Sequence, residues 1–260
     1  MKRILTALLM IPVVAYAVLW ADYWVFLAVL AVAALLSYRE YNAISTDYGL
    51  GAPGAAGYAA GLLLLVWRNQ TWPAWFLIVA FAVIALMLAM RPDDLSQSLP
   101  RAAMLLMGIV YIFGCWKCAI PLREDFHSRH WLMYALLLNW SGDIGAYYIG
   151  RPFGKHKLAP VVSPKKSWEG SIASVVTSVL VAGAYLWHFV PGVNPFHILG
   201  LTVAANIAGQ FGDLAESALK RGAGVKDSGG ILPGHGGFLD RVDSTLFALP
   251  VIYGYLMLVG

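Results

Sequence analysis

Long apolar runs separated by short polar segments dominate the pattern of hydrophobic and polar positions along this chain. A helix that crosses a bilayer needs about 20 mostly apolar residues, with a range of roughly 17–25. The pattern therefore predicts about nine membrane-spanning helices, at 4–20, 23–37, 55–67, 73–90, 102–121, 131–150, 170–190, 196–212 and 245–259. The second and third runs are short and rich in Ala and Gly, so a half-span or an interfacial helix is the alternative there.

The composition supports a membrane protein, because 60% of the residues are hydrophobic and 12% are charged. Soluble domains contain about half apolar and about a quarter charged residues. We therefore expect an all-α polytopic membrane protein. Residues 1–140 form an N-terminal scaffold of about six helices, the sixth running to 150. Residues 141–260 form a catalytic region with cytoplasmic loops at 151–169 and 213–244.

The basic residues predict the orientation, because Lys and Arg accumulate in the cytoplasmic loops of membrane proteins. With the N-terminus in the cytoplasm and the C-terminus outside, most of the 18 basic residues fall on the cytoplasmic side. Arg68, Arg123 and Arg129 fall outside, and Lys117 lies within a predicted span, where a charge usually faces the protein interior or reaches an interface. The net charge of +4 fits this topology, so we expect no nucleic-acid partner.

Candidate chemistry begins at the end of the sixth span. Asp143 lies at or near membrane depth, where a carboxylate is a candidate functional group, with a hydrogen-bonded structural role as the alternative. The next loop gathers Lys155, Lys157, Lys165 and Lys166, followed by Ser167. Lysines here attract phosphate, either of a substrate or of anionic lipid at the membrane surface. The accompanying Gly, Pro and Ser residues favour a phosphate-binding loop.

A second polar segment combines carboxylates with a helical spacing. If 213–221 extends the eighth span, Asp213, Glu216, Ser217 and Lys220 lie at i, i+3, i+4 and i+7, on one helix face. A similar spacing recurs at Asp240, Asp243 and Ser244. Oxygen ligands without Cys or His suit a hard cation such as magnesium, which takes one or two carboxylates plus substrate phosphate oxygens.

Glycine-rich sequence separates these two acidic groups. Glycines allow backbone amides to surround a phosphate. Lys220, Arg221, Lys226 and Arg241 add cationic donors, so the segment has the groups that a nucleoside triphosphate and its metal require. His235 either presents its imidazole to phosphate or stabilises a turn.

Together these residues resemble a known family. The segment Ser217-x-Leu-Lys-Arg-x4-Lys-Asp-x-Gly-x2-Leu-Pro-x-His-Gly-Gly-Phe-x-Asp-Arg-Val-Asp243 is similar to the signature of the phosphatidate cytidylyltransferases, or CDP-diglyceride synthases. The Asp143-x-x-Ala-Tyr, Gly-Lys-His-Lys-Leu and Ser-Pro-Lys-Lys-Ser-Trp-Glu-Gly blocks also resemble that family. The first six spans match in hydrophobic character only.

The resemblance implies a magnesium-dependent homodimer that converts CTP and phosphatidate into CDP-diacylglycerol and pyrophosphate. It also implies a second cation, K⁺, and places Asp213, Ser217 and Asp240 at the metal site. Our own hypothesis is that Asp213, Asp240 and Asp243 hold magnesium, with Glu216 as a neighbouring ligand. The side chains of Lys165, Lys166, Lys220, Arg221 and Lys226 then bind the triphosphate or the lipid phosphate, in an assignment that the sequence leaves open.

Two alternatives are compatible with parts of the pattern. One is another membrane transferase, such as a phosphatidyl-alcohol transferase or a CTP-dependent polyprenol kinase. The Asp-Gly-x2-Ala-Arg pattern of the former is absent. The other is a cation transporter with intramembrane acids, which has little use for a loop rich in Lys and Gly. The compact chain suggests a bacterial inner membrane, with the active site facing the cytoplasm.

Overall fold

The computed structural model describes residues 2–50, 54–68, 74–89, 95–126, 128–231 and 236–259, and helices dominate these ranges. The N-terminal helices are α1 (Lys2–Leu19), α2 (Tyr23–Asp47), α3 (Gly54–Val66) and α4 (Ala74–Ala89). A continuous helical segment follows, made of η1 (Leu95–Gln97), α5 (Ser98–Gly108), η2 (Ile109–Gly114), α6 (Cys115–Lys117) and α7 (Ala119–Glu124).

The C-terminal part contains longer helices and one small sheet. Its elements are α8 (His130–Phe153), β1 (Lys157–Ala159), β2 (Ser163–Ser167), α9 (Trp168–Ser178), η3 (Val179–Gly183), α10 (Ala184–Phe189), α11 (Pro195–Gly222), η4 (Leu239–Arg241) and α12 (Asp243–Val259). The segments α9, η3 and α10 form one helical rod from Trp168 to Phe189.

Local sequence explains where three of the long helices begin. Asp22 precedes α2, and its carboxylate accepts hydrogen bonds from the amides of Trp24 and Val25. Ser167 precedes α9 and accepts from the Gly170 amide at 3.2 Å, and Asn194 precedes α11, with Pro195 at the first helical position. These side chains satisfy amides that have no partner within the helix. Pro is tolerated at the first helical position because the amide hydrogen that it lacks would have no partner there.

Four helical segments of the described chain are long and apolar enough to cross a membrane: Tyr23–Asp47, Leu95–Glu124, Trp168–Phe189 and Pro195–Gly222. Shorter apolar helices occur at Met10–Leu19, Gly54–Val66, Leu77–Leu88 and Asp243–Val259. The chain is thus a helical membrane protein. The second predicted span, which the sequence defined only to residue 37, is a helix of 25 residues.

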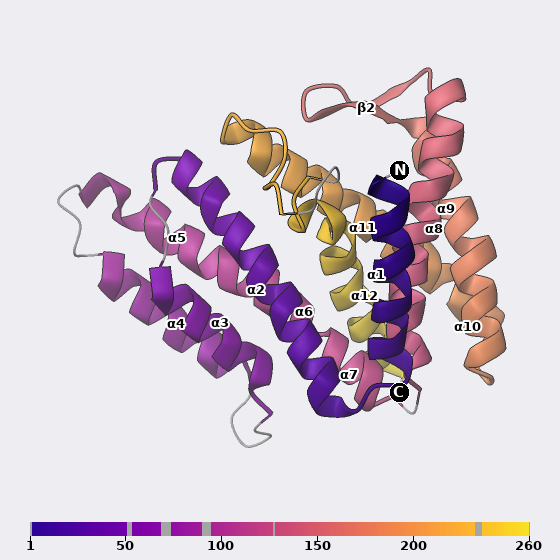
Figure 1. Cartoon of the computed structure of the whole chain (residues 1–260), viewed down its shortest axis with the longest axis horizontal. Coiled ribbons are helices and arrows are strands. Elements are labelled where there is room, and N and C mark those ends of the chain that lie inside the picture. The colour runs from indigo at the N-terminus through magenta and orange to yellow at the C-terminus, as the bar shows by residue number, and fades with distance from the viewer. Residues whose placement is uncertain are drawn as a thin grey trace.

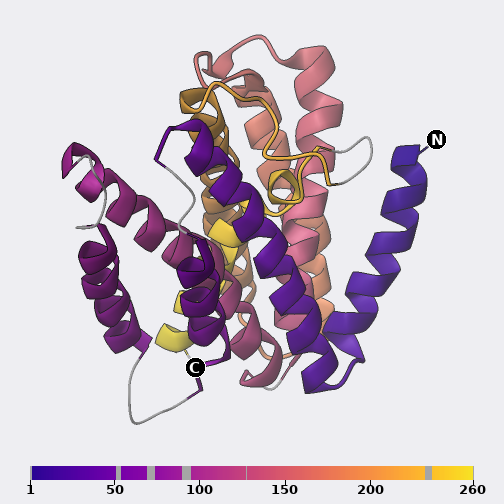
Figure 2. The same cartoon turned by 60° about the vertical axis from the view of Figure 1, so that its left-hand side comes forward.

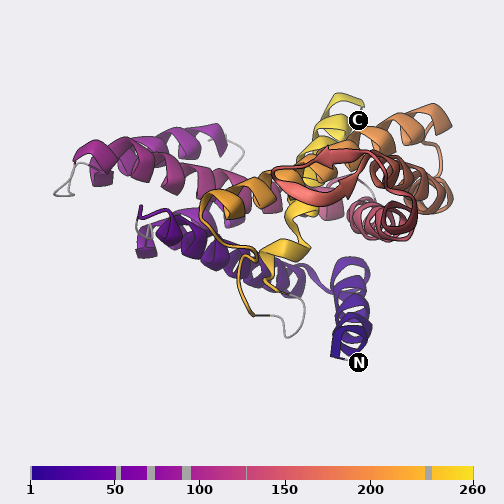
Figure 3. The same cartoon turned by 90° about the horizontal axis from the view of Figure 1, so that it is seen from above.

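The helices stand side by side, with α3 to α5 at one side, α8 to α10 at the other, and α2, α11 and α12 between them (Figures 1 and 3). The helix α1 packs at the edge, against α2 and α8. The start of α1 and the end of α12 lie at opposite ends of the bundle (Figures 1 and 2). The β1–β2 hairpin and the segment after α11 lie at the same end as the start of α1.

A short antiparallel hairpin replaces part of the loop that we expected at 151–169. Lys157 pairs with Ser167, and Ala159 pairs with Ser163. The segment contains no alternation of apolar and polar residues, so the period of two that predicts a strand is missing from its sequence. The hairpin leads directly into α9, so it fixes the lysines of β2 near the start of that helix.

The helices α8 and α9 approach closely beneath the hairpin. A Cβ added at Gly150 would lie 3.2 Å from the Cα of Gly170, and one added at Gly170 would lie 3.2 Å from the Cα of Gly150, so a side chain at either position would crowd the other helix. Gly154 is more restricted, because an added Cβ would lie 2.3 Å from the Gly150 carbonyl oxygen and 2.5 Å from the Ser167 Oγ. This close packing holds the end of α8 against the start of α9, where the polar residues of the C-terminal region gather.

An aromatic core connects α2 to the neighbouring helices. Tyr38 and Tyr41 of α2 are fully buried, as is Phe113 of η2. The ring of Tyr38 lies 5.1 Å from that of Phe113 and 4.9 Å from that of Tyr58 in α3, centroid to centroid. Aromatic rings in such pairs contribute both buried apolar area and favourable edge contacts. The C-terminal half of α2 is therefore anchored in the bundle.

Lys117, the charge that the sequence placed inside a span, points into the protein. Its Nζ donates hydrogen bonds to the carbonyls of Leu64 at 2.9 Å and Trp67 at 2.5 Å, at the end of α3. The ammonium thus satisfies carbonyls that have no partner within the helix, and it opposes the negative end of the helix dipole.

Replacing this ammonium should destabilise the bundle. We expect Lys117→Met to leave the α3 carbonyls without donors and to reduce the free energy of unfolding by about 1–3 kcal/mol. Thermal unfolding of the detergent-solubilised protein measures the effect. Lys155→Met, at an exposed position, is the matched control. Equal melting temperatures for the two variants would contradict the capping role.

Candidate functional site

A cavity of about 650 Å³ lies where α8, the hairpin, α9 and α11 meet. Its polar lining includes Asp143, Tyr147, Arg151, Lys157, Lys165, Lys166, Ser167, Ser171, Gln210, Asp213 and Ser244. The wall therefore combines four basic groups with two carboxylates. Such a lining suits an anionic ligand that is accompanied by a cation.

Lys166 and Asp213 join the hairpin to α11 across this cavity. The Lys166 Nζ lies 2.6 Å from Asp213 Oδ2, and both side chains are partly exposed. Asp143 is close enough to Asp213 and Lys166 to interact with both electrostatically. The structure thus brings together residues from the three polar segments that the sequence singled out.

The predicted acidic face of α11 exists, because the helix continues to Gly222. Ser217 Oγ donates to Asp213 Oδ1 at 3.3 Å, one helical turn away. Glu216 is fully buried, and its carboxylate forms an ion pair with Lys220, also one turn along the same helix. The spacing of these four residues therefore produces the neighbours that the pattern predicted.

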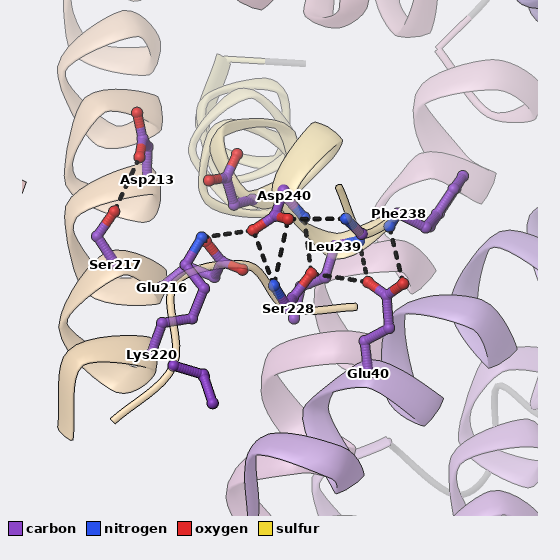
Figure 4. A network of polar contacts seen from close by, with 12 residues as sticks. Glu40, Asp213, Glu216, Ser217, Lys220, Ser228, Phe238, Leu239 and Asp240 are labelled. Atoms are coloured by element: carbon purple, nitrogen blue, oxygen red, sulfur yellow. Dashed lines mark hydrogen bonds and ion pairs between the residues drawn. The ribbon is translucent and has the colours of Figure 1, made fainter. Parts of the chain in front are cut away.

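Lys220 also forms an ion pair with Asp240, and so connects α11 to the segment that precedes α12 (Figure 4). Asp240 accepts further hydrogen bonds from the amides of Gly237 at 2.8 Å and Ser228 at 3.2 Å. Burial of the Asp240 carboxyl raises its pKa, but the Lys220 ammonium and the Gly237 amide outweigh burial and hold the pKa below its usual value. Asp240 is therefore a carboxylate at neutral pH.

Asp243 begins α12 and is buried beside the acidic face of α11. Its Oδ1 accepts a hydrogen bond from the Ser244 amide at 2.6 Å. The carboxyl group interacts electrostatically with Asp213, Glu216 and Asp143. Asp143, Asp213 and Glu216 therefore all act electrostatically on Asp243, and the mutual repulsion of these four carboxyl groups favours a cation near them.

Two observations test whether a magnesium ion fits this region. Across the described residues, no group of three or more His, Cys, Asp or Glu side chains has the arrangement of a ready-made metal site. Magnesium does not require one, since it usually binds one or two carboxylates and completes its shell with water and substrate phosphates. The buried Glu216 Oε1 also has no hydrogen-bond partner in the structure. The oxygen-only donor set fits magnesium.

The remaining predicted site residues lie at different distances from the cavity. Lys165 and Ser167 line it, and Ser167 also caps α9. Lys226 and Arg241 are exposed, as is Arg221, which donates to the Val225 carbonyl at 3.2 Å. These three, together with Lys220 and Asp240, are not part of the cavity wall. His235 lies outside the described residues.

Several polar residues near the site were not selected from the sequence. Tyr147, Arg151 and Gln210 line the cavity, and the first belongs to the Asp-x-x-Ala-Tyr block already noted. Glu40 of α2 is buried, and it accepts hydrogen bonds from the segment that carries Asp240. Nothing in the local pattern of α2 distinguishes Glu40 from an ordinary charge at the end of a span.

Comparison with known proteins gives a consistent result along the chain. The sequence profile of the cytidylyltransferase family matches residues 1–259. A phosphatidate cytidylyltransferase of Staphylococcus aureus (strain COL) is 36% identical over 233 residues, which cover 88% of this chain and 87% of the relative. Proteins with the same name from Bacillus subtilis (strain 168) and Staphylococcus haemolyticus (strain JCSC1435) are 37% identical over 182 residues and 45% identical over 151 residues.

The alignment with the Bacillus subtilis protein covers 70% of this chain and 68% of the relative, and that with the Staphylococcus haemolyticus protein covers 58% and 57%. The family match thus includes both the helices that resembled the family only in hydrophobic character and the polar segments that form the cavity. The chain belongs to the cytidylyltransferase family.

Proposed function

We propose that this chain transfers the cytidylyl group of CTP to phosphatidate, which yields CDP-diacylglycerol and pyrophosphate. The observation that carries the proposal is the cavity at the end of the helix bundle, in which Lys166 meets Asp213 and three further basic groups line the wall. A phosphate attached to a lipid and the triphosphate of CTP both need cationic donors at the boundary of the bilayer. The family match supports the same reaction.

The reaction does not need a strong general base. A phosphate monoester has a second pKa near ~6, so phosphatidate is mostly dianionic at neutral pH. Its oxygen attacks the α-phosphorus of CTP, a new P–O bond forms, and the bond to pyrophosphate breaks. The main obstacle is repulsion between two anionic substrates, so catalysis depends on cations and on positioning.

Two groups of residues supply the phosphate binding and the metal binding that the reaction needs. Lys165 and Lys166, with Arg151 and Lys157, bind phosphate groups in the cavity. Asp213, Asp240 and Asp243, with Ser217 and Glu216, would hold magnesium, which neutralises phosphate charge when it is bound. Lys220 keeps Asp240 beside Glu216. Arg221, Lys226 and Arg241 are exposed cations at the same end and attract the triphosphate from solution.

We also propose a topology and an assembly for the enzyme. Nine spans, a cytoplasmic N-terminus and an outer C-terminus are supported by the basic residues and by the opposite ends at which α1 starts and α12 finishes. The cavity and the hairpin then face the cytoplasm of a bacterial inner membrane. Magnesium, a second cation such as K⁺, and a homodimer are proposed from the family resemblance.

Transfer of label tests the reaction. Purified protein, detergent-dispersed phosphatidate and CTP labelled at the α-phosphate should give labelled lipid, and the transfer should stop when EDTA removes divalent cations and return with added magnesium. A folded protein that binds CTP but transfers no label would exclude this reaction. Release of pyrophosphate separates it from cation transport.

The role of Asp240 has its own test. Asp240→Asn retains the size of the side chain but removes the charge that pairs with Lys220. We expect the variant to lose at least about 100-fold in kcat while the protein remains folded in detergent. Arg129→Ala, whose side chain contacts the Leu19 carbonyl at the opposite end of the bundle, is the control and should keep its activity. Near-normal turnover of Asp240→Asn would remove this residue from the metal site.

The cavity lysine can be tested by substrate titration. Lys166→Met should lower kcat/KM by about 10- to 100-fold, because it removes a charge-assisted contact worth ~1.5–3 kcal/mol. Steady-state rates at varied CTP and varied phosphatidate identify the substrate whose phosphate it contacts. Unchanged kcat/KM for both substrates would place the phosphates away from this cavity.

A further inference from the structure

Glu40 is a buried carboxylate in the N-terminal helices, whose sequence otherwise carries little chemistry. It lies in α2, and only 3% of the residue surface is exposed. Its Oε1 accepts a hydrogen bond from the Phe238 amide at 2.9 Å, and its Oε2 accepts from the Leu239 amide at 2.8 Å. The Ser228 hydroxyl donates to the same Oε2 at 2.8 Å. All three donors belong to the segment between α11 and α12.

These bonds continue directly to Asp240 (Figure 4). The Ser228 hydroxyl, which donates to Glu40, accepts a hydrogen bond from the Asp240 amide at 3.3 Å. The Ser228 amide in turn donates to the Asp240 carboxylate. Glu40 therefore binds Ser228, Phe238 and Leu239. Ser228 in turn contacts Asp240, which forms the ion pair with Lys220.

Two glycines leave the room that this carboxylate occupies. A Cβ added at Gly229 would lie 2.6 Å from Glu40 Oε1, and one added at Gly237 would lie 2.4 Å from Glu40 Oε2 and 2.0 Å from Ser228 Oγ. Real side chains do not make such short contacts. Part of the glycine content of this segment is thus explained by close approach to Glu40.

We propose that Glu40 is a positioning residue for the transfer reaction. Its hydrogen bonds to Ser228, which contacts Asp240, and to Phe238 and Leu239, which precede Asp240, keep the Asp240 carboxylate beside Lys220 and Glu216. This role rests on the proposed function, because it acts through Asp240. A carboxylate is suited to it, since both oxygens are acceptors and all three groups facing it are donors.

The experiment compares Glu40→Gln with the wild-type enzyme. Glutamine has nearly the same shape but replaces one acceptor oxygen by an NH2 group, which then faces a backbone amide donor. We expect kcat to fall by about 10- to 100-fold, or the magnesium concentration for half-maximal rate to rise by a similar factor, as for other groups that orient metal ligands. The KM values for CTP and phosphatidate should change by less than about threefold, because the cavity wall is intact.

Asp22→Asn is the matched control. Asp22 is also a carboxylate that accepts from two backbone amides of α2, but it directly precedes the helix and so lies far along it from Glu40. Its kinetics should equal those of the wild type. Ser228→Ala removes the hydroxyl that links Glu40 Oε2 to the Asp240 amide without altering a charge, while Glu40 keeps its bonds to Phe238 and Leu239. It should therefore shift the magnesium dependence in the same direction but by a smaller factor than Glu40→Gln. The double variant Glu40→Gln with Ser228→Ala should lose little more than Glu40→Gln alone.

Each outcome decides a different question. A folded Glu40→Gln enzyme with kcat and magnesium dependence within about twofold of wild type overturns the positioning role. If Glu40→Gln does not fold, Ser228→Ala decides, and unchanged magnesium dependence in that variant overturns the role. Absence of transfer by the wild type and by Asp22→Asn overturns the proposed function itself.

Discussion

The ammonium group of Lys220 holds the polar region together, because it lies between two carboxylates from different parts of the chain. Glu216 belongs to the same helix, whereas Asp240 lies beyond the glycine-rich segment. All three side chains are largely buried, and a buried carboxylate without a cation is costly. Lys220 therefore connects the end of α11 to the segment that precedes α12 through charge as well as through packing.

The cavity and this connection share the helix α11. Asp213 lies one turn before Ser217 on α11, and its pairing with Lys166 attaches the hairpin to the same helix that carries Lys220. The helix thus presents the Asp213 carboxylate to the hairpin and the Lys220 ammonium to the segment before α12. A single rigid helix face therefore sets the distance between the lysine of the hairpin and the acidic residues that follow Asp213, which a flexible loop would not do.

The sequence predicted most of the helices and the acidic face of α11, since apolar runs and the spacing of Asp213, Glu216 and Lys220 reflect local geometry. The β1–β2 hairpin was not predicted, because its lysines and serines do not alternate with apolar residues. Glu40 was missed for a different reason. Its partners depend on how α2 packs against a distant segment, and a single sequence contains no local signal for that contact. The metal and the dimer remain predictions.

The contacts of Glu40 also have a consequence for the order of folding. Its partners Ser228 and Leu239 follow it by 188 and 199 residues. Contacts of such long sequence separation form late, because a large loop of chain has to close first. During synthesis, α2 is made before the residues that donate hydrogen bonds to Glu40. The polar region of this protein is therefore completed only when the last helices join the bundle, and an incomplete chain cannot assemble it.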